Sequence, residues 1–306
     1  MRMHPKSGYL EVSELHKIYY EVHGNIKGDP ILYIHGGPGA GFSEKAKRFF
    51  DFERHLVIFF DQRGASKSIP FGSIEENTTQ HLVNDITKLL NLLKVDKVTL
   101  FGGSWGTTLS LIFAIQYPNR INRLLLIGLF LGDKKSIDYY LDGGIKDKYP
   151  LIWERFKKLV PTTSKYSISE YYLEKMINGS DEEKKLFCYE WAFYEMSIFK
   201  KNIKPKEVET LLNQMSYESL SILEAHYLSN ASFIEEGYII KNINKLKDIP
   251  IKIVHGKYDD ICPLKFAVSF DEKASNSKLY ITNAGHSDSE LETEQKLIEL
   301  LKTNVW

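Results

Sequence analysis

The chain has 306 residues, of which 43% are hydrophobic and 26% charged, so it can bury a full core as one large domain or as a domain with an insertion. Forty basic residues balance forty acidic ones, and this balance gives no electrostatic footprint for nucleic acid or for an anionic membrane. The two cysteines, Cys188 and Cys262, are too few for a disulfide framework and lack the spacing of a zinc site. Residues 1–10 have no apolar stretch of signal-peptide length, and the longest apolar run, 124–131, is too short to span a membrane, so we expect a cytoplasmic protein.

Short apolar segments alternate with helical patterns along most of the chain. Residues 9–12 and 18–22 have the pattern of an antiparallel hairpin at a sheet edge. Apolar runs bounded by Gly, Pro, Asp or Asn predict buried parallel strands at 31–34, 56–60, 98–101, 124–127, 251–254 and 279–281. Helical periodicity occupies 82–93, 109–117 and 297–301. This alternation predicts an α/β protein with a doubly wound, mostly parallel sheet.

The alternation stops between residues 132 and 241, where Tyr, Trp, Glu and Lys dominate. The periodicity there is helical, most clearly at 182–199 and 206–228. We therefore expect a helical cap domain, 132–241, inserted into a core domain formed by 1–131 and 242–306. A cap above the carboxyl ends of the strands would cover the place where such sheets bind ligands, so it should determine specificity.

The segment Gly102-Gly103-Ser104-Trp105-Gly106 lies between a predicted strand and a predicted helix. This G-x-S-x-G pattern is typical of a nucleophile elbow, in which a tight turn exposes the serine hydroxyl. A serine needs a base, and the base needs an orienting carboxylate. His286 and Asp259 both follow predicted strands and give the chain order Ser, Asp, His that is typical of α/β-hydrolases. Less favoured alternatives are Asp260 or Asp288 as the carboxylate and His255 as the base.

The oxyanion formed when a serine attacks a carbonyl needs two fixed hydrogen-bond donors. Trp105, directly after the serine, and Gly37, in the loop after strand 31–34, can supply backbone N–H groups. A phosphate-binding role for that loop is disfavoured, because no Gly-Lys-Ser/Thr follows it and Pro38 removes a donor.

Taken together, the motifs resemble the proline iminopeptidase (prolyl aminopeptidase) family of α/β-hydrolase-fold serine peptidases. The resemblance rests on HGGPG at 35–39, DQRG at 61–64, GGSWGT at 102–107, HGKYD at 255–259 and AGH at 284–286. Weaker matches lie at 77–79, 142–143 and 153–156. One departure is visible, because Ala65-Ser66-Lys67-Ser68 replaces the residue and second glycine that usually follow DQRG in the family.

The resemblance implies further site residues in the cap and beside the serine. Glu195 and Glu224 match the two glutamates that hold the substrate's free amino group, with Glu190 as a rival for the first position. Phe130 and Tyr140 match positions that line the pocket for the proline ring, and Cys262 matches a cysteine close to it. No metal and no cofactor are implied.

The resulting prediction is a serine exopeptidase that releases N-terminal proline from small peptides through a prolyl-enzyme intermediate. The alternatives are an esterase or lactonase of the same fold, an aminopeptidase of broader specificity, or a binding protein that keeps the fold without activity.

Overall fold

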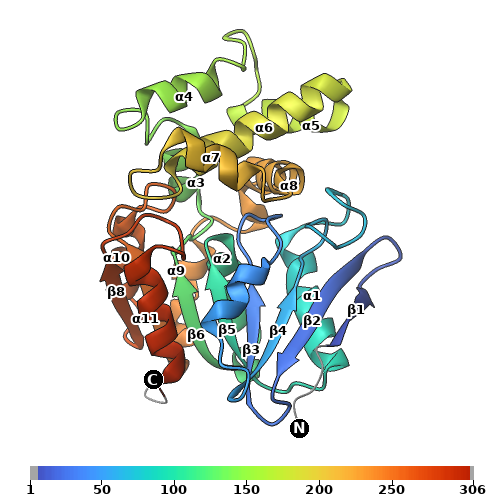
Figure 1. Ribbon diagram of the computed structural model, residues 1–306, viewed down its shortest axis with the longest axis vertical. Coiled ribbons are helices and arrows are strands. Elements are labelled where there is room, and N and C mark those ends of the chain that lie inside the picture. The colour runs from blue at the N-terminus through green and yellow to red at the C-terminus, as the bar shows by residue number, and fades with distance from the viewer. Residues whose placement is uncertain (1–5, 304–306) are drawn as a thin grey trace.

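One sheet of eight strands organises the protein, a computed structural model of which describes residues 6–303 (Figure 1). Residues 1–5 and 304–306 of the predicted core segments lie outside this part. The strand order is β1-β2-β4-β3-β5-β6-β7-β8. The strands are β1 (Lys6–Glu11), β2 (Lys17–Gly24), β3 (Asp29–Ile34), β4 (His55–Phe60), β5 (Val98–Gly103), β6 (Ile121–Ile127), β7 (Ile251–Gly256) and β8 (Ser277–Thr282).

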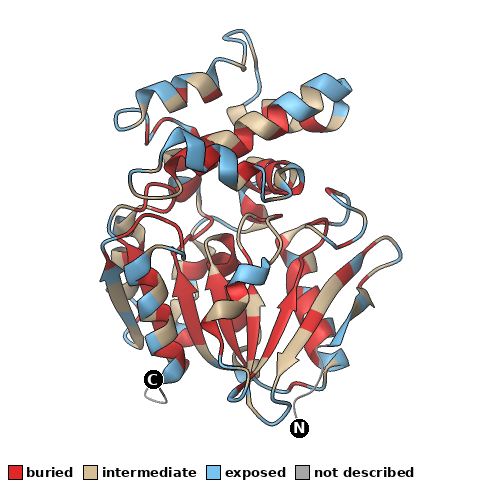
Figure 2. Cartoon of the chain, viewed as in Figure 1, coloured by how far each residue is buried: buried red, intermediate tan, exposed pale blue. Residues whose placement is uncertain are grey.

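The sheet has an antiparallel edge and a parallel centre. β1 and β2 form an antiparallel hairpin, and β2 pairs antiparallel with β4. From β4 to β8 all neighbours are parallel. The predicted hairpin and the six predicted parallel strands are therefore confirmed. The central strands are almost wholly buried (Figure 2), as expected for parallel strands covered on both faces.

Successive strand residues contribute to two separate apolar cores, one on each face of the sheet. Leu32, Ile58 and Leu100 pack in the core that also contains the apolar faces of helices α1, α2 and α10. Their neighbours Ile31 and Val57 pack in the other core, with residues of the helices η1 and α11. The alternation follows from the two-residue period of a strand. The core helices are η1 (Glu44–Phe49), α1 (Thr79–Leu92), α2 (Trp105–Gln116), η2 (Pro118–Arg120), η4 (Ile243–Leu246), α10 (Leu264–Asp271) and α11 (Leu291–Lys302).

Most of the chain between β6 and β7 is helical, and its larger part, 134–229, forms a cap at one end of the sheet (Figure 1). Two of its helices begin with a capping box, at Ser167 and Ser180, in which serine and glutamate satisfy one another's backbone N–H groups. Among residues 6–303, no helix has the length and apolar character needed to cross a membrane. Before η4, the helices between β6 and β7 are α3 (Lys134–Leu141), α4 (Pro150–Lys157), α5 (Ile168–Asn178), α6 (Asp181–Ile198), α7 (Pro205–Leu212), α8 (Tyr217–Ser229), η3 (Ala231–Phe233) and α9 (Tyr238–Lys241).

One feature of the cap differs from the helical pattern expected at 206–228. The structure divides this stretch into α7 and α8, and residues 213–216 connect the two helices. The apolar spacing continues through the break, because Leu212 and Met215 both pack in a small core with α6. Periodicity alone therefore gave no sign of the turn.

Candidate active site

Ser104 lies in the turn between β5 and α2, with a strained backbone conformation (φ 54°, ψ −122°). Its amide donates to the carbonyl of Ile127 on β6, which ties the turn to the adjacent strand. Two flanking glycines are sterically required. A Cβ at Gly106 would lie 2.1 Å from the carbonyl oxygen of Ile34, and one at Gly102 would lie 2.4 Å from the Gly106 carbonyl oxygen. The local sequence thus produces the tight turn that a nucleophile elbow needs.

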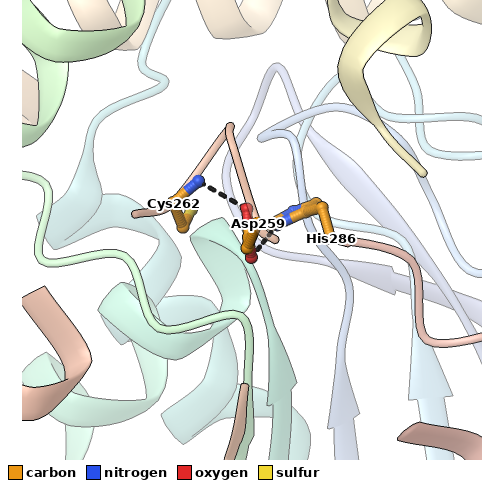
Figure 3. A group of neighbouring side chains, drawn as sticks. All are labelled: Asp259, Cys262 and His286. Carbon is orange, nitrogen blue, oxygen red and sulfur yellow. Dashed lines mark hydrogen bonds and ion pairs between the residues drawn. The ribbon is translucent and has the colours of Figure 1, made fainter. Parts of the chain in front are cut away.

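Asp259 and His286 come together from the loops after β7 and β8 (Figure 3). Nδ1 of His286 lies 2.7 Å from Oδ2 of Asp259, and both side chains are buried. Oδ1 of Asp259 accepts the amides of Ile261 (3.1 Å) and Cys262 (2.7 Å), which fixes the carboxylate. Burial acts to lower the pKa of His286, but Asp259, together with Cys262, outweighs it and raises this pKa well above its usual value.

The structure places the alternative triad residues in other roles, and Asp288 pairs with the Arg48 guanidinium at 3.2 Å. Asp260 pairs with the Lys148 ammonium at 2.6 Å and accepts from the Tyr149 hydroxyl. His255 uses both ring nitrogens, since Nδ1 accepts the Leu129 amide and Nε2 lies 2.7 Å from the Cys262 carbonyl oxygen. Each group already has its partners, so Asp259 and His286 form the pair best suited to serve Ser104.

Cys262 is a neighbour of both the histidine and the serine. Its thiol has the side chains of both Ser104 and His286 as hydrogen-bonding neighbours, whereas no hydrogen bond joins Ser104 directly to His286 within residues 6–303. Catalytic hydrogen bonds are often long without substrate and shorten when it binds. Burial raises the pKa of the Cys262 thiol to about 11, so the thiol is neutral near pH 7.

Potential metal ligands also meet at this place. Atoms of Asp259, Cys262 and His286 that could ligate a cation lie within 4.8 Å of one another (Figure 3). The Asp259 carboxylate and the His286 imidazole already bond to each other, and the thiol is protonated, so a cation would have to displace both features. The arrangement fits a proton-transfer pair better than a metal centre.

Two backbone N–H groups near Ser104 are available for an oxyanion. Gly37 lies in the loop after β3, and Trp105 is the first residue of α2, where helix amides lack intrahelical partners. Neither amide donates a hydrogen bond to another described residue. The Gly37 loop is close to the serine, because a Cβ at the neighbouring Gly36 would lie 3.1 Å from Ser104 Cβ.

Gln62 connects the two loops that carry these amides, a role that the sequence reasoning did not assign. Its Oε1 accepts from the Trp105 indole at 2.9 Å, and its Nε2 donates to the His35 carbonyl at 2.9 Å. Its own amide donates to Nε2 of His35. The DQRG motif was the available signal, but a motif does not say which side chain reaches which loop. The departure at 65–68 leaves this neighbourhood ordered, since Ser68 donates to the Asp61 carbonyl.

Glu195 on α6 and Glu224 on α8 form a buried pair of carboxyl groups. Oε2 of Glu224 accepts from the Trp191 indole at 2.7 Å, and the two carboxyl groups are electrostatic neighbours. Burial raises the pKa of Glu195, and burial together with the charge of Glu195 raises the pKa of Glu224 well above its usual value. Glu190, the rival position, instead pairs with both nitrogens of the Arg155 fork at 2.7 Å.

The remaining predicted pocket residues are also buried. The Tyr140 hydroxyl has no hydrogen-bond partner among the described residues, and its electrostatic neighbours include Glu195, Glu224 and Cys262. The Phe130 carbonyl accepts from the Thr107 and Thr108 hydroxyls, which places this segment beside the first turn of α2.

A cavity of about 570 Å³ opens onto the serine. Ser104, His286, Gly37 and Glu195 all line it, whereas Phe130, Tyr140, Glu224 and Cys262 do not. Its apolar wall is formed by five side chains of the cap: Met196, Phe199, Leu211, Met215 and Leu220. Its size is typical of cavities that hold small organic ligands.

The sheet order, the strand-end serine and the inserted cap define an α/β hydrolase. The family model described as "alpha/beta hydrolase fold" matches residues 29–293. Among solved structures, an esterase from Exiguobacterium antarcticum is similar, with a TM-score of 0.67 and 22% identity, over 97% of this chain and 98% of that one. A proline iminopeptidase from Mycobacterium smegmatis has a TM-score of 0.66 at 16% identity, over 97% of this chain and 96% of that one. At such identities these two structures support the fold.

Sequence relatives narrow the family. Proline iminopeptidase from Arabidopsis thaliana is 37% identical over 93% of this chain and 76% of its own length. Proline iminopeptidase from Neisseria meningitidis is 36% identical over 92% of this chain and 90% of its own length. The chain belongs to the proline iminopeptidase family of α/β hydrolases, as the sequence motifs indicated.

Proposed function

We propose that this enzyme is a serine exopeptidase that removes N-terminal proline from small peptides. In the proposed mechanism Ser104 Oγ attacks the prolyl carbonyl carbon while His286 takes its proton. Asp259 holds the imidazole, and the amides of Gly37 and Trp105 stabilise the oxyanion. His286 then protonates the leaving amine, and water hydrolyses the prolyl ester by the same route. A cytoplasmic location stays a prediction.

The observation that carries the proposal is the pair of buried carboxyl groups beside the serine cavity. Oε2 of Glu195 and the hydroxyl of Tyr140 are both buried without a hydrogen-bond partner among the described residues. Unpartnered polar atoms are costly in a protein interior unless a ligand pairs with them. A protonated prolyl nitrogen offers two N–H donors and a positive charge, which suits a pair of carboxyl groups that ordinarily share a proton.

The same geometry supports cleavage after a single residue. Glu195 lines the cavity together with Ser104, whereas Phe130, Tyr140, Glu224 and Cys262 are buried outside its lining. In this proposal the N-terminal proline is held between Ser104 and these buried residues. The cavity itself then accommodates the part of the peptide that leaves. A substrate with a longer N-terminal extension would have to displace the buried glutamates.

Hydrolysis of a fluorogenic prolyl amide tests the proposal, with the alanyl and N-acetyl-prolyl amides as comparisons and Ser104→Ala as the inactive control. Acetylation removes the charge and both N–H donors, because the nitrogen becomes a tertiary amide, and it leaves the buried carboxyl groups unpaired at about 1 to 3 kcal/mol each. We expect kcat/KM to fall at least tenfold to a hundredfold relative to the free prolyl amide. Equal turnover of the acetylated and free substrates would refute the amine clamp. Turnover of aryl esters without any prolyl amide would favour an esterase.

A further inference from the structure

The chain segment that follows α6 is bonded to the loop that carries His286. The carbonyl of Phe199 accepts the amides of His286 (3.0 Å) and Ser287 (3.1 Å). The Phe199 ring also packs edge-on against the imidazole, with 5.7 Å between centroids. Gly285 approaches the same segment so closely that a Cβ there would lie 2.7 Å from the Lys201 amide nitrogen. The end of α6, which belongs to the cap, is therefore bonded directly to the loop that carries the candidate base His286.

Glu290 fastens this junction from the core side. Its Oε2 accepts the Gly285 amide at 2.7 Å. The Lys201 amide of the cap lies beside the same carboxylate, since a Cβ at Gly285 would meet the Lys201 nitrogen at 2.7 Å and Glu290 Oε2 at 3.1 Å, and this amide acts to lower the pKa of Glu290. Glu290 occupies the N-cap position of α11, yet its side chain makes no capping bond to that helix. A residue placed to cap its own helix instead directs its carboxylate to the loop after β8, beside the cap, and a charge-assisted hydrogen bond of this kind is among the stronger ones.

The junction bears on the proposed function because Glu195 lies on the same end of α6. Glu195 and Phe199 are four residues apart at the end of α6, which is about one helical turn. The carboxyl group proposed to hold the substrate amine and the carbonyl that fixes the base's backbone thus sit on one rigid helix end. A shift of about 1 Å between substrate and catalytic group can cost about a hundredfold in rate.

We infer that Glu290 is a positioning residue that holds the cap glutamate Glu195 and the base His286 in register. The inference rests on the proposed function, because it uses the roles assigned there to Glu195 and His286. An amine-bearing substrate is held at its N-terminus by the cap and must meet a base carried by the core. An ester without an amine is not held by the cap, so it can adjust to the position of the base if the loop moves.

The chain supplies a matched control for a purely structural effect. Glu292 also accepts a backbone amide of the loop after β8, that of Asn283 at 2.8 Å, but no residue of the cap is its hydrogen-bond partner. Replacing Glu292 therefore removes a bond of the same kind from the same loop and leaves the junction with α6 intact.

The test compares Glu290→Ala, Glu290→Gln and Glu292→Ala on a prolyl amide and on an aryl acetate, well below each variant's Tm. We expect Glu290→Ala to lower kcat on the prolyl amide about ten- to a hundredfold and on the ester less than about threefold. Glu290→Gln keeps an acceptor oxygen and should recover most of the loss, and Glu292→Ala should change the amide-to-ester ratio by less than about twofold.

An equal fall on both substrates, or an unchanged ratio in Glu290→Ala, would overturn the inference and leave the proposed function standing. If the alanine variant fails to fold, Glu290→Asp, whose carboxylate is one methylene too short to keep the bond to the Gly285 amide, takes its place, and an unchanged amide-to-ester ratio would again overturn the inference. A wild-type enzyme without activity on the prolyl amide would overturn the proposed function and this inference together.

Discussion

Asp259 divides its two carboxylate oxygens between the backbone and the imidazole. Oδ1 accepts two amides of its own loop, so the carboxylate keeps its orientation whether or not the histidine is charged. Oδ2 is left for Nδ1 of His286. The imidazolium holds the pKa of Asp259 below its usual value, although burial acts in the opposite direction. The carboxylate is therefore ionised over the whole range in which the enzyme would work.

This pairing predicts the pH dependence of the reaction. His286 must be neutral to accept the serine proton, and Asp259 raises its pKa above 6.5. We therefore expect kcat/KM for the prolyl amide to increase with pH, and the midpoint of this acidic limb of the pH profile should lie above pH 6.5. Asp259→Asn should move that limb to lower pH and reduce kcat about 10³- to 10⁴-fold. Asp260→Asn, whose carboxylate serves Lys148 and Tyr149 instead, should leave the limb in place. A limb at the same pH in Asp259→Asn would contradict this assignment.

Single residues differ in how visible their roles are in the sequence. Ser104, Asp259 and His286 could be proposed because nucleophile, carboxylate and base each follow a recognisable strand. The junction of Glu290 with the cap could not, because it involves backbone amides of Gly285 and Lys201, which leave no side-chain pattern. Contacts of this kind depend on where segments distant in the chain come together.

At the scale of elements, the glycines of the turn between β5 and α2 differ in how much room each has for a side chain. A Cβ at Gly106 would meet the Ile34 carbonyl oxygen at 2.1 Å, whereas nothing lies within 4 Å of one at Gly103. We expect Gly106→Ala to destabilise the fold by about 3 kcal/mol or more, because the backbone of β3 cannot yield. Gly103→Ala should change the free energy of unfolding by less than about 0.5 kcal/mol. Denaturant unfolding of both variants measures this, and equal losses would show that the turn is not limited by this contact.

The elements themselves were predictable to different degrees. Buried parallel strands are short apolar runs between turn residues, so the strands of the sheet could be predicted from the sequence. The division of the 206–228 stretch into α7 and α8 could not, because Leu212 and Met215 keep the helical spacing across the turn. Helical periodicity reports which face is buried, and that face continues where the backbone bends.

At the scale of the whole molecule, the cap meets the core around buried charge. Glu195 and Glu224 face the candidate catalytic residues from two different cap helices, and His286 is bonded to the end of one of them. Such an arrangement favours substrate recognition over stability, since two carboxyl groups without a cation are costly to bury. The pairing of α6 with α8 depends on tertiary contacts, which explains why the cap glutamates could be proposed from the family resemblance and not from their spacing.

The stability of the molecule should therefore depend on Glu224 and on pH. Its pKa is raised in the folded state, so the native protein holds a proton that the unfolded chain releases, and stability falls as pH rises above about 4.3 toward the folded pKa. Glu224→Gln keeps an acceptor for the Trp191 indole and removes the buried charge. We expect it to stabilise the fold by about 0.5 to 2 kcal/mol at pH 8 and by less at pH 5. Hydrolysis of the prolyl amide should fall at least tenfold because the amine loses a partner. Thermal unfolding of the wild type and of Glu224→Gln at both pH values tests the predicted change in stability. An equal gain in Tm at pH 5 and pH 8 would show that removal of the buried charge is not the cause.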